Sequence, residues 1–197
     1  MRESVRMIVV LTLISMVSAG ILSQVYNYTF SIIQANLARE LEVSIFQVLP
    51  GTQSVRSIDT GASTFVEDDR SSLRAQEGDI PLSLFEALDE KEQPIGFAYV
   101  GEDSGYAGII KVLVGVDVVT NRITGIKILE HVETPGLGSR IEQINFRSQF
   151  EGKTINDSIA LGQDIDNITG ATVSARAVTD AVRNGFSRAT QVYKGER

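Results

Sequence analysis

The stretch Ile95–Leu129 (IGFAYVGEDSGYAGIIKVLVGVDVVTNRITGIKIL) decides the fold. Its apolar runs are rich in Val and Ile, which favour strands, and they are separated by residues typical of turns. We predict strands over Ile95–Val100, Ile109–Val119 and Ile123–Leu129, with a hairpin turn at Thr120–Arg122. Strands joined by such short connections predict an antiparallel sheet.

The segment Gly101–Gly108, between the first two strands, has glycines on both sides of Tyr106. Glycine lets the backbone approach a planar ligand closely, so this segment is a candidate ligand contact. A plain connecting loop is the alternative, and the residues leave both open.

Two long helices are predicted to flank the sheet. Thr29–Leu49 repeats apolar residues every three or four positions and is followed by Pro50-Gly51, which stops a helix. The C-terminal segment Ala175–Tyr193 carries one apolar stripe. That stripe consists of Val178, Val182, Phe186, Ala189 and Tyr193. The fold class is therefore α+β, an antiparallel sheet with packed helices.

The remaining segments carry weaker signals. Ser139–Phe150 is predicted as one helix with Ile141, Ile144 and Phe150 facing inward. Lys153–Ile168 is predicted as loop and strand. Within the poorly patterned residues 51–93, a short helix or strand is predicted over Pro81–Leu88, and no chemistry is assigned there.

Met7–Val25 is a mainly apolar segment without a charge, close to the length of about 20 residues that spans a bilayer. Arg2 and Arg6 precede it, and the next cation is Arg39, so the positive-inside rule places the N-terminus in the cytoplasm. We therefore predict a cytoplasmic N-terminus (residues 1–6), one transmembrane helix (7–25) and an extracytoplasmic domain (26–197). The chain would be a single-pass protein of the cytoplasmic (inner) membrane.

A cleaved signal peptide is the competing interpretation, because Val17-Ser18-Ala19 is an acceptable cleavage context. The apolar run continues past Ala19 through Ile21-Leu22, and a helical pattern follows without a polar linker. Both features favour a retained anchor. Either way, the folded domain lies beyond the cytoplasmic membrane.

Composition excludes several classes of function. The 197 residues carry a net charge of −7 and no basic cluster, which argues against nucleic acid as a partner. The chain has no cysteine and one histidine, which excludes disulfides, iron–sulfur clusters and multi-histidine metal sites within it. Redox chemistry would thus need an organic cofactor.

The segment Asp166–Thr172 (DNITGAT) leads into the last predicted helix. Small residues at Gly170 and Ala171 let an anion approach the main chain, where free N–H groups and the helix dipole favour negative charge. Hydroxyls at Thr169, Thr172 and Ser174 crowd the same point. By residue type alone, a helix cap and a turn are the simpler explanation of the motif.

The pattern Asp-x-x-Thr-Gly-Ala-Thr resembles the flavinylation motif of the FMN-binding domain family. The resemblance implies that Thr172 carries FMN through a phosphoester bond, with Ser174 as the nearby alternative, and that Asp166, Thr169, Gly170 and Ala171 belong to the recognition pattern. No base stands beside Thr172 in the sequence, so a separate flavin transferase, using FAD and a divalent metal, is implied for maturation.

A second segment, His131–Gly138 (HVETPGLG), resembles a loop of one subset of that family, the G subunits of Rnf-type ion-translocating ferredoxin:NAD oxidoreductases. The resemblance implies that Glu133, Thr134, Gly136 and Leu137 line the cofactor pocket and that Tyr106 lies near the flavin. His131 suggests proton transfer, but a lone histidine at a strand end is more often structural.

The resemblance implies an electron-carrier subunit that holds covalent FMN and works with the other subunits of a membrane complex. It would be a redox subunit without a complete active site of its own, because no Gly-x-Gly-x-x-Gly dinucleotide fingerprint is present. Two alternatives remain: the C subunit of sodium-translocating NADH:quinone reductase, and a membrane-tethered interaction module without flavin.

Overall fold

The computed structural model describes residues 2–58 and 82–195 and divides the chain into two compact units, Met1–Glu40 and Leu41–Arg197. Helix α1 (Arg2–Val48) runs through the first unit and ends in the second. Its segment Val5–Phe30 is long and apolar enough to cross a membrane, with a mean hydropathy of 2.2. The predicted helix over Thr29–Leu49 is confirmed as part of the same continuous helix.

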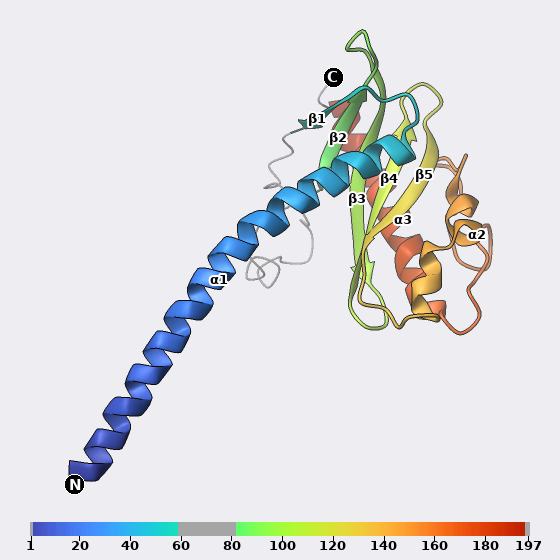
Figure 1. Ribbon diagram of the computed structural model, residues 1–197. Coiled ribbons are helices and arrows are strands. Elements are labelled where there is room, and N and C mark those ends of the chain that lie inside the picture. The colour runs from blue at the N-terminus through green and yellow to red at the C-terminus, as the bar shows by residue number, and fades with distance from the viewer. Residues whose placement is uncertain (1, 59–81, 196–197) are drawn as a thin grey trace. The chain divides into compact units, whose positions relative to one another are not determined.

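The second unit is built on a five-stranded antiparallel sheet in which each strand pairs with the next along the chain (Figure 1). This meander is the antiparallel arrangement that the sequence predicted. The strands are β1 (Ser54–Ile58), β2 (Leu84–Leu88), β3 (Pro94–Ser104), β4 (Ile109–Asp117) and β5 (Arg122–Glu130). For Pro81–Leu88 the sequence left a short helix or a short strand open, and the structure has a strand there, β2. Residues 59–81 lie outside the described part of the chain.

Helix α3 (Thr172–Gly195) covers one face of the sheet, as Figure 1 shows. Its predicted stripe, from Val178 to Tyr193, is buried in the main core together with Phe97 and Tyr99. Two glycines allow α3 to lie close to β3. A Cβ at Gly101 would lie 2.5 Å from the Ala181 carbonyl oxygen, and a Cβ at Gly185 would lie 2.4 Å from the Tyr99 ring.

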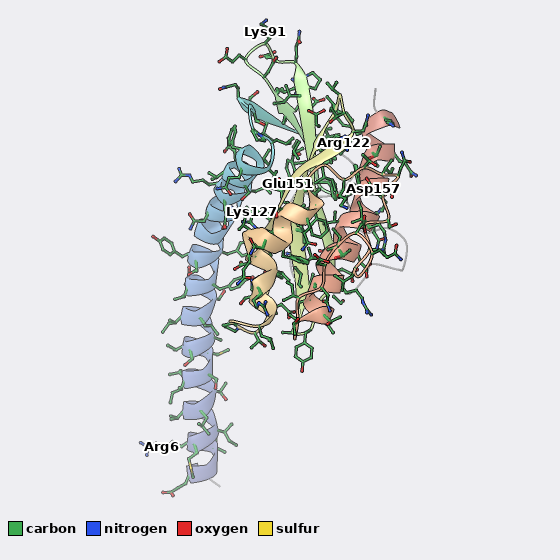
Figure 2. The ribbon with its side chains drawn as sticks, turned by 90° about the vertical axis from the view of Figure 1, so that its right-hand side faces the viewer. Arg6, Lys91, Arg122, Lys127, Glu151 and Asp157 are labelled. Atoms are coloured by element: carbon green, nitrogen blue, oxygen red, sulfur yellow. The ribbon has the colours of Figure 1, made fainter. Side chains whose placement is uncertain are left out.

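The end of α1 covers the opposite face. Ile45, Val48 and Leu49 pack there against side chains such as Ala98 and Leu113, which alternate along their strands with residues of the main core. The ammonium group of Lys127, labelled in Figure 2, donates to the Ser44 hydroxyl over 2.8 Å. The sheet is thus a middle layer, and the residues of α1 after Glu40 belong to its core.

The structure corrects two of the strand limits. Strand β3 continues to Ser104, which pairs with Ile109, so the connection predicted over Gly101–Gly108 is only the loop Gly105–Gly108. Strand β4 ends at Asp117 and not at Val119, because the Asp117 carboxylate accepts the N–H groups of Val119 and Thr120 and closes a turn.

The single helix predicted over Ser139–Phe150 was wrong. The segment consists of η2 (Gly138–Glu142), α2 (Ile144–Arg147) and η3 (Ser148–Phe150). Gln143 adopts an extended backbone (ψ 141°) between the first two, which resets the helical phase. As a result Ile144 is 62% exposed and Phe146 is buried in its place.

The strand predicted within Lys153–Ile168 was also wrong. Among its residues only isolated bridges form, such as Leu161 with Ile165. The Asp164 carboxylate accepts the backbone N–H groups of Ile159 and Ala160, so side-chain bonds take the place of a strand ladder.

Candidate functional site

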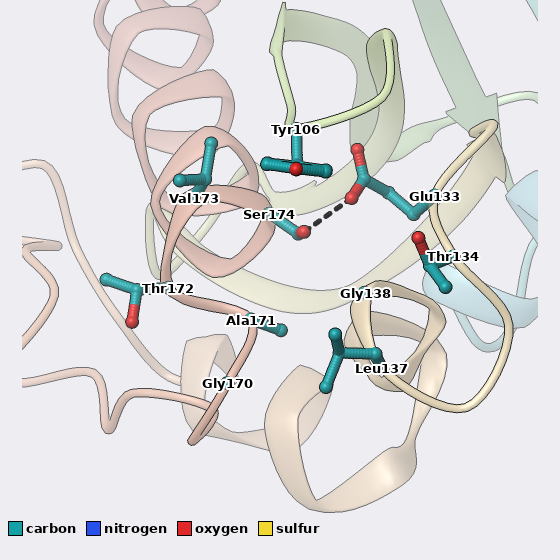
Figure 3. A pocket seen from close by; sticks show the side chains of 10 residues that line it. All are labelled: Tyr106, Glu133, Thr134, Leu137, Gly138, Gly170, Ala171, Thr172, Val173 and Ser174. Carbon is teal, nitrogen blue, oxygen red and sulfur yellow. Dashed lines mark hydrogen bonds between the residues drawn. The ribbon is translucent and has the colours of Figure 1, made fainter.

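A cleft of about 550 Å³ lies at the end of the sheet where β3 and β5 finish (Figure 3). The β3–β4 loop, the chain after β5 and the first turn of α3 enclose it. Its volume is typical of sites for small molecules. The lining residues are Tyr106, Glu133, Thr134, Leu137, Gly138, Gly170, Ala171, Thr172, Val173 and Ser174.

Glu133 joins the three segments that form the cleft. Its side chain is buried, at 5% exposure. The Ser174 hydroxyl donates to its Oε2 over 2.6 Å, and the backbone N–H of Ala107 donates to its Oε1 over 2.9 Å. One carboxylate thereby fixes the start of α3 and the β3–β4 loop against the chain after β5.

The contacts of Glu133 also determine its charge. Burial raises the pKa of its carboxyl, but hydrogen bonds from the Ser174 hydroxyl and from the N–H groups of Ala107 and Tyr106, together with the nearby His131 ring, outweigh burial. The net effect holds the pKa of Glu133 below its ordinary value, so the cleft contains a fixed negative charge at neutral pH.

His131, beside this carboxylate, holds the chain after β5 in place through both of its ring nitrogens. Its Nδ1 accepts the backbone N–H of Glu133 over 3.1 Å, and its Nε2 lies 3.2 Å from a carboxylate oxygen of Glu142. Both ring nitrogens are therefore engaged in holding the chain after β5, and this arrangement favours the structural interpretation of His131 over proton transfer.

Two glycines make room for the Glu133 carboxylate. A Cβ at Gly138 would lie 2.6 Å from Oε2, and a Cβ at Gly105 would lie 2.4 Å from Oε1. Real Cβ atoms do not approach oxygen this closely, so a side chain at either position would displace Glu133 or its loop.

The two sequence motifs lie close together. Gly170 has a φ of +84°, and a Cβ there would lie 3.0 Å from a methyl group of Leu137. The Arg140 guanidinium donates to the carbonyl oxygen of Thr169 over 3.1 Å. The loop before α3 is thus packed against the loop after β5 on one side of the cleft.

The first turn of α3 presents two hydroxyls in different environments. Thr172 is exposed, and its Oγ accepts a hydrogen bond from the side-chain amide of Asn167 over 2.9 Å. Ser174 is 2% exposed and its hydroxyl is committed to Glu133. The helix begins at Thr172, so the free N–H groups of this turn and the positive end of the helix dipole lie beside the cleft.

The cleft brings together eight of the predicted site residues: Tyr106, Glu133, Thr134, Leu137, Gly170, Ala171, Thr172 and Ser174. Three others do not line it. Asp166 donates its N–H to the Gln149 side chain, Thr169 provides its carbonyl to Arg140, and the Gly136 N–H, where φ is +76°, donates to the Ser139 hydroxyl. These three shape the loops around the cleft.

Two lining residues, Gly138 and Val173, were not predicted. Gly138 ends the His131–Gly138 motif, and its proximity to Glu133 appears only in the folded chain. Val173 stands between Thr172 and Ser174, at 50% exposure, and an exposed valine in a helix gives no signal in the sequence.

A family model of the FMN-binding domain matches residues 105–187. The chain is 28% identical over 185 residues to the G subunit of the ion-translocating oxidoreductase complex of Methanosarcina acetivorans, covering 93% of each chain. It is 30% identical over 184 residues to the corresponding G subunit of Shewanella baltica, covering 88% of this chain and 84% of that one.

Among solved structures, the fold is similar to that of NqrC from Shewanella oneidensis, with a TM-score of 0.59 and 19% sequence identity. The match covers 80% of this chain and 99% of NqrC. At this identity the likeness concerns the fold, and it agrees with the α+β class predicted from the sequence.

Proposed function

The chain belongs to the family of G subunits of ion-translocating oxidoreductase complexes, and from that membership we propose that it carries FMN covalently on Thr172 and relays electrons between other subunits of such a complex. The match to the FMN-binding domain over residues 105–187 supports FMN as the cofactor, because all ten residues that line the cleft fall within it.

The cleft has the chemistry that FMN requires. Tyr106, Leu137 and Val173 offer aromatic and apolar surface for a planar ring, and Gly170 and Ala171 keep bulk away from the main chain. When bound, FMN would supply one- and two-electron transfer. The first turn of α3 offsets the charge of an attached phosphate by about 0.3–1 kcal/mol if the site is exposed.

The contrast between Thr172 and Ser174 carries the proposal for the attachment point. Thr172 is exposed at the edge of the cleft, whereas Ser174 is 2% exposed and donates its hydroxyl to Glu133. Figure 3 shows Thr172 well apart from the Glu133–Ser174 pair. An enzyme that transfers flavin reaches an exposed hydroxyl, so Thr172 is the acceptor and Ser174 supports the cleft.

The apolar segment Val5–Phe30 contains the predicted span of residues 7–25 and supports retention of the chain in the cytoplasmic membrane. Residues 1–6, with Arg2 and Arg6, would lie on the cytoplasmic side and residues 26–197 on the extracytoplasmic side. There the phosphoester prevents loss of the cofactor. The other subunits of the complex are the partners for electron transfer, and the flavin transferase is the partner during maturation.

The test is expression of the full chain with a flavin transferase, followed by a denaturing gel under ultraviolet light and mass spectrometry of the intact protein. The wild type and Ser174→Ala should give a fluorescent band with the mass of one attached FMN, and Thr172→Ala should give a dark band.

A wild-type band that stays dark, while a control acceptor is labelled in the same cells, would refute the proposal and favour an interaction module without flavin. A fluorescent Thr172→Ala band combined with a dark Ser174→Ala band would move the attachment to Ser174.

A further inference from the structure

We infer that Asn167 is a positioning residue for flavin attachment, because its side-chain amide holds the Thr172 hydroxyl in the orientation needed to attack an incoming flavin dinucleotide. This inference rests on the proposed function, in which Thr172 is the acceptor. Position 167 is one of the unspecified positions of the Asp-x-x-Thr-Gly-Ala-Thr pattern, so the sequence motif assigns it no part.

The contact between the two side chains spans a tight turn. Asn167 Nδ2 donates to Thr172 Oγ over 2.9 Å, and both side chains are exposed. Between them the Ala171 N–H donates to the Ile168 carbonyl over 2.9 Å, and Gly170 adopts a φ of +84°. This turn reverses the chain and brings residue 167 beside the first residue of α3.

The turn is anchored on both sides of Asn167. Before it, the Asp166 N–H donates to the Gln149 side chain over 2.6 Å. After it, Ile168 is 7% exposed in the main core, and Arg140 holds the Thr169 carbonyl over 3.1 Å. A short side chain on an anchored backbone has few positions available, so the amide is held against Thr172 before any partner binds.

The direction of this hydrogen bond suits a nucleophile. A threonine hydroxyl has one proton and two lone pairs. The Asn167 amide occupies one lone pair, which leaves the other lone pair for attack and the proton for removal by a base of the transferase. As the proton leaves, the same amide N–H stabilises the negative charge that develops on Oγ.

The step balances as a phosphoryl-type transfer. A bond forms between Thr172 Oγ and the flavin-side phosphorus of the dinucleotide, and the bond from that phosphorus to the bridging oxygen breaks. The adenosine monophosphate leaves with the electron pair of that bond. The hydroxyl proton passes to the transferase, and the divalent cation that accompanies the dinucleotide neutralises the leaving phosphate.

A turn-stabilising role is the competing explanation for the same contact. It predicts a change in stability or in docking to the transferase but not in the rate of the transfer itself. The rate constant at saturating enzyme therefore separates the two roles, provided that folding is measured in parallel.

The experiment uses the purified full-length apo-protein in detergent, a purified flavin transferase, FAD and magnesium. Attachment is followed by intact mass against time over a range of transferase concentrations. Asn167→Ala should lower the maximal rate constant by about tenfold, because the hydrogen bond strengthens as negative charge develops on the Thr172 oxygen. Asn167→Asp, which turns the donor into an acceptor and adds a negative charge, should lower it at least as much.

Asn156→Ala, a change at an exposed asparagine in another loop, is the matched control and should attach flavin at the wild-type rate. Thermal unfolding of each apo-protein checks that the fold is intact. Wild-type maximal rate constants for both Asn167 variants would overturn the inference. That result would do so even if the variants needed a higher concentration of transferase to reach half of the maximal rate. A wild-type chain that accepts no flavin would overturn the proposed function itself, which is a different result.

Discussion

The hydroxyl of Ser174 donates to the buried carboxylate of Glu133 over 2.6 Å and thereby ties the first turn of α3 to the chain that follows β5. The two residues are 41 positions apart in the chain: Glu133 belongs to the His131–Gly138 motif, and Ser174 follows the Asp166–Thr172 motif by two residues. Their bond shows that the two segments form one site. It also commits one of the two hydroxyls in the turn to a structural role.

Glu133 should make stability depend on acid pH. Its folded pKa is depressed, so its contribution to stability is present in full above the ordinary carboxyl value of 4.5 and is lost as pH falls below that value through the folded pKa. Glu133→Gln should lower stability at pH 7 and flatten the fall in acid. Urea unfolding of the full chain, followed through the unit of residues 41–197 from pH 7 to pH 3, checks both expectations.

Glu102→Gln, at an exposed carboxylate of β3, is the control for that series and should keep the wild-type acid profile. Other carboxylates with depressed pKa values, such as Asp117 and Asp164, will keep part of the acid sensitivity in every variant. A Glu133→Gln profile parallel to the wild type would contradict the assigned role.

Ser174→Ala should destabilise the apo-protein while leaving flavin attachment possible. The change removes a hydrogen bond to a buried charged group, which costs about 1.5–3 kcal/mol. Thr172→Ala removes only an exposed contact and should cost much less. Denaturant unfolding of the two apo-variants, measured before any flavin is added, compares the costs; equal losses would show that Ser174 does not support the cleft.

Gly185→Ala should destabilise the protein although alanine is the better helix former. A Cβ at this position would lie 2.4 Å from the Tyr99 ring, which is fully buried and donates its hydroxyl to the Val182 carbonyl. Overpacking of this kind costs about 1–3 kcal/mol, which exceeds the gain of about 1 kcal/mol in helix propensity. Thermal unfolding shows whether Gly185→Ala lowers or raises the stability of the protein.

Asn184→Ala is the matched change for Gly185→Ala, because it lies next to it on α3 and is exposed. It should raise stability by roughly 0.5 kcal/mol through helix propensity alone. If both variants were stabilised, the close contact between α3 and β3 would not exist in solution.

The end of α1 should contribute to the stability of the sheet. Ile45 is 1% exposed in the second core, so Ile45→Ala should cost about 2–5 kcal/mol. Phe46 is 37% exposed on the same helix. Phe46→Ala should therefore lower the free energy of unfolding clearly less than Ile45→Ala, although phenylalanine is the larger side chain. Unfolding curves monitored by circular dichroism test the order, and the reverse order would place the other face of α1 against the sheet.

The sequence determined the elements whose apolar pattern is long and regular. The strands from Ile95 onward, the stripe of α3 and the helix over Thr29–Leu49 follow from local periodicity, because each must bury one continuous face. It failed at Ser139–Phe150, where an extended Gln143 interrupts the period. It also failed at Lys153–Ile168, where carboxylate–backbone bonds replace the ladder.

By itself, the sequence also determined which residue types would line the cleft, since glycines, hydroxyls and a helix start can be recognised locally. Only the tertiary structure decided how they are used. It exposed Thr172 to solvent, it buried Ser174 against the Glu133 carboxylate, and it set the Asn167 amide against the Thr172 hydroxyl. The burial of Ser174 depends on Glu133, 41 positions away, and the turn that holds Asn167 beside Thr172 is anchored by Gln149 and Arg140, so no local pattern specifies either arrangement.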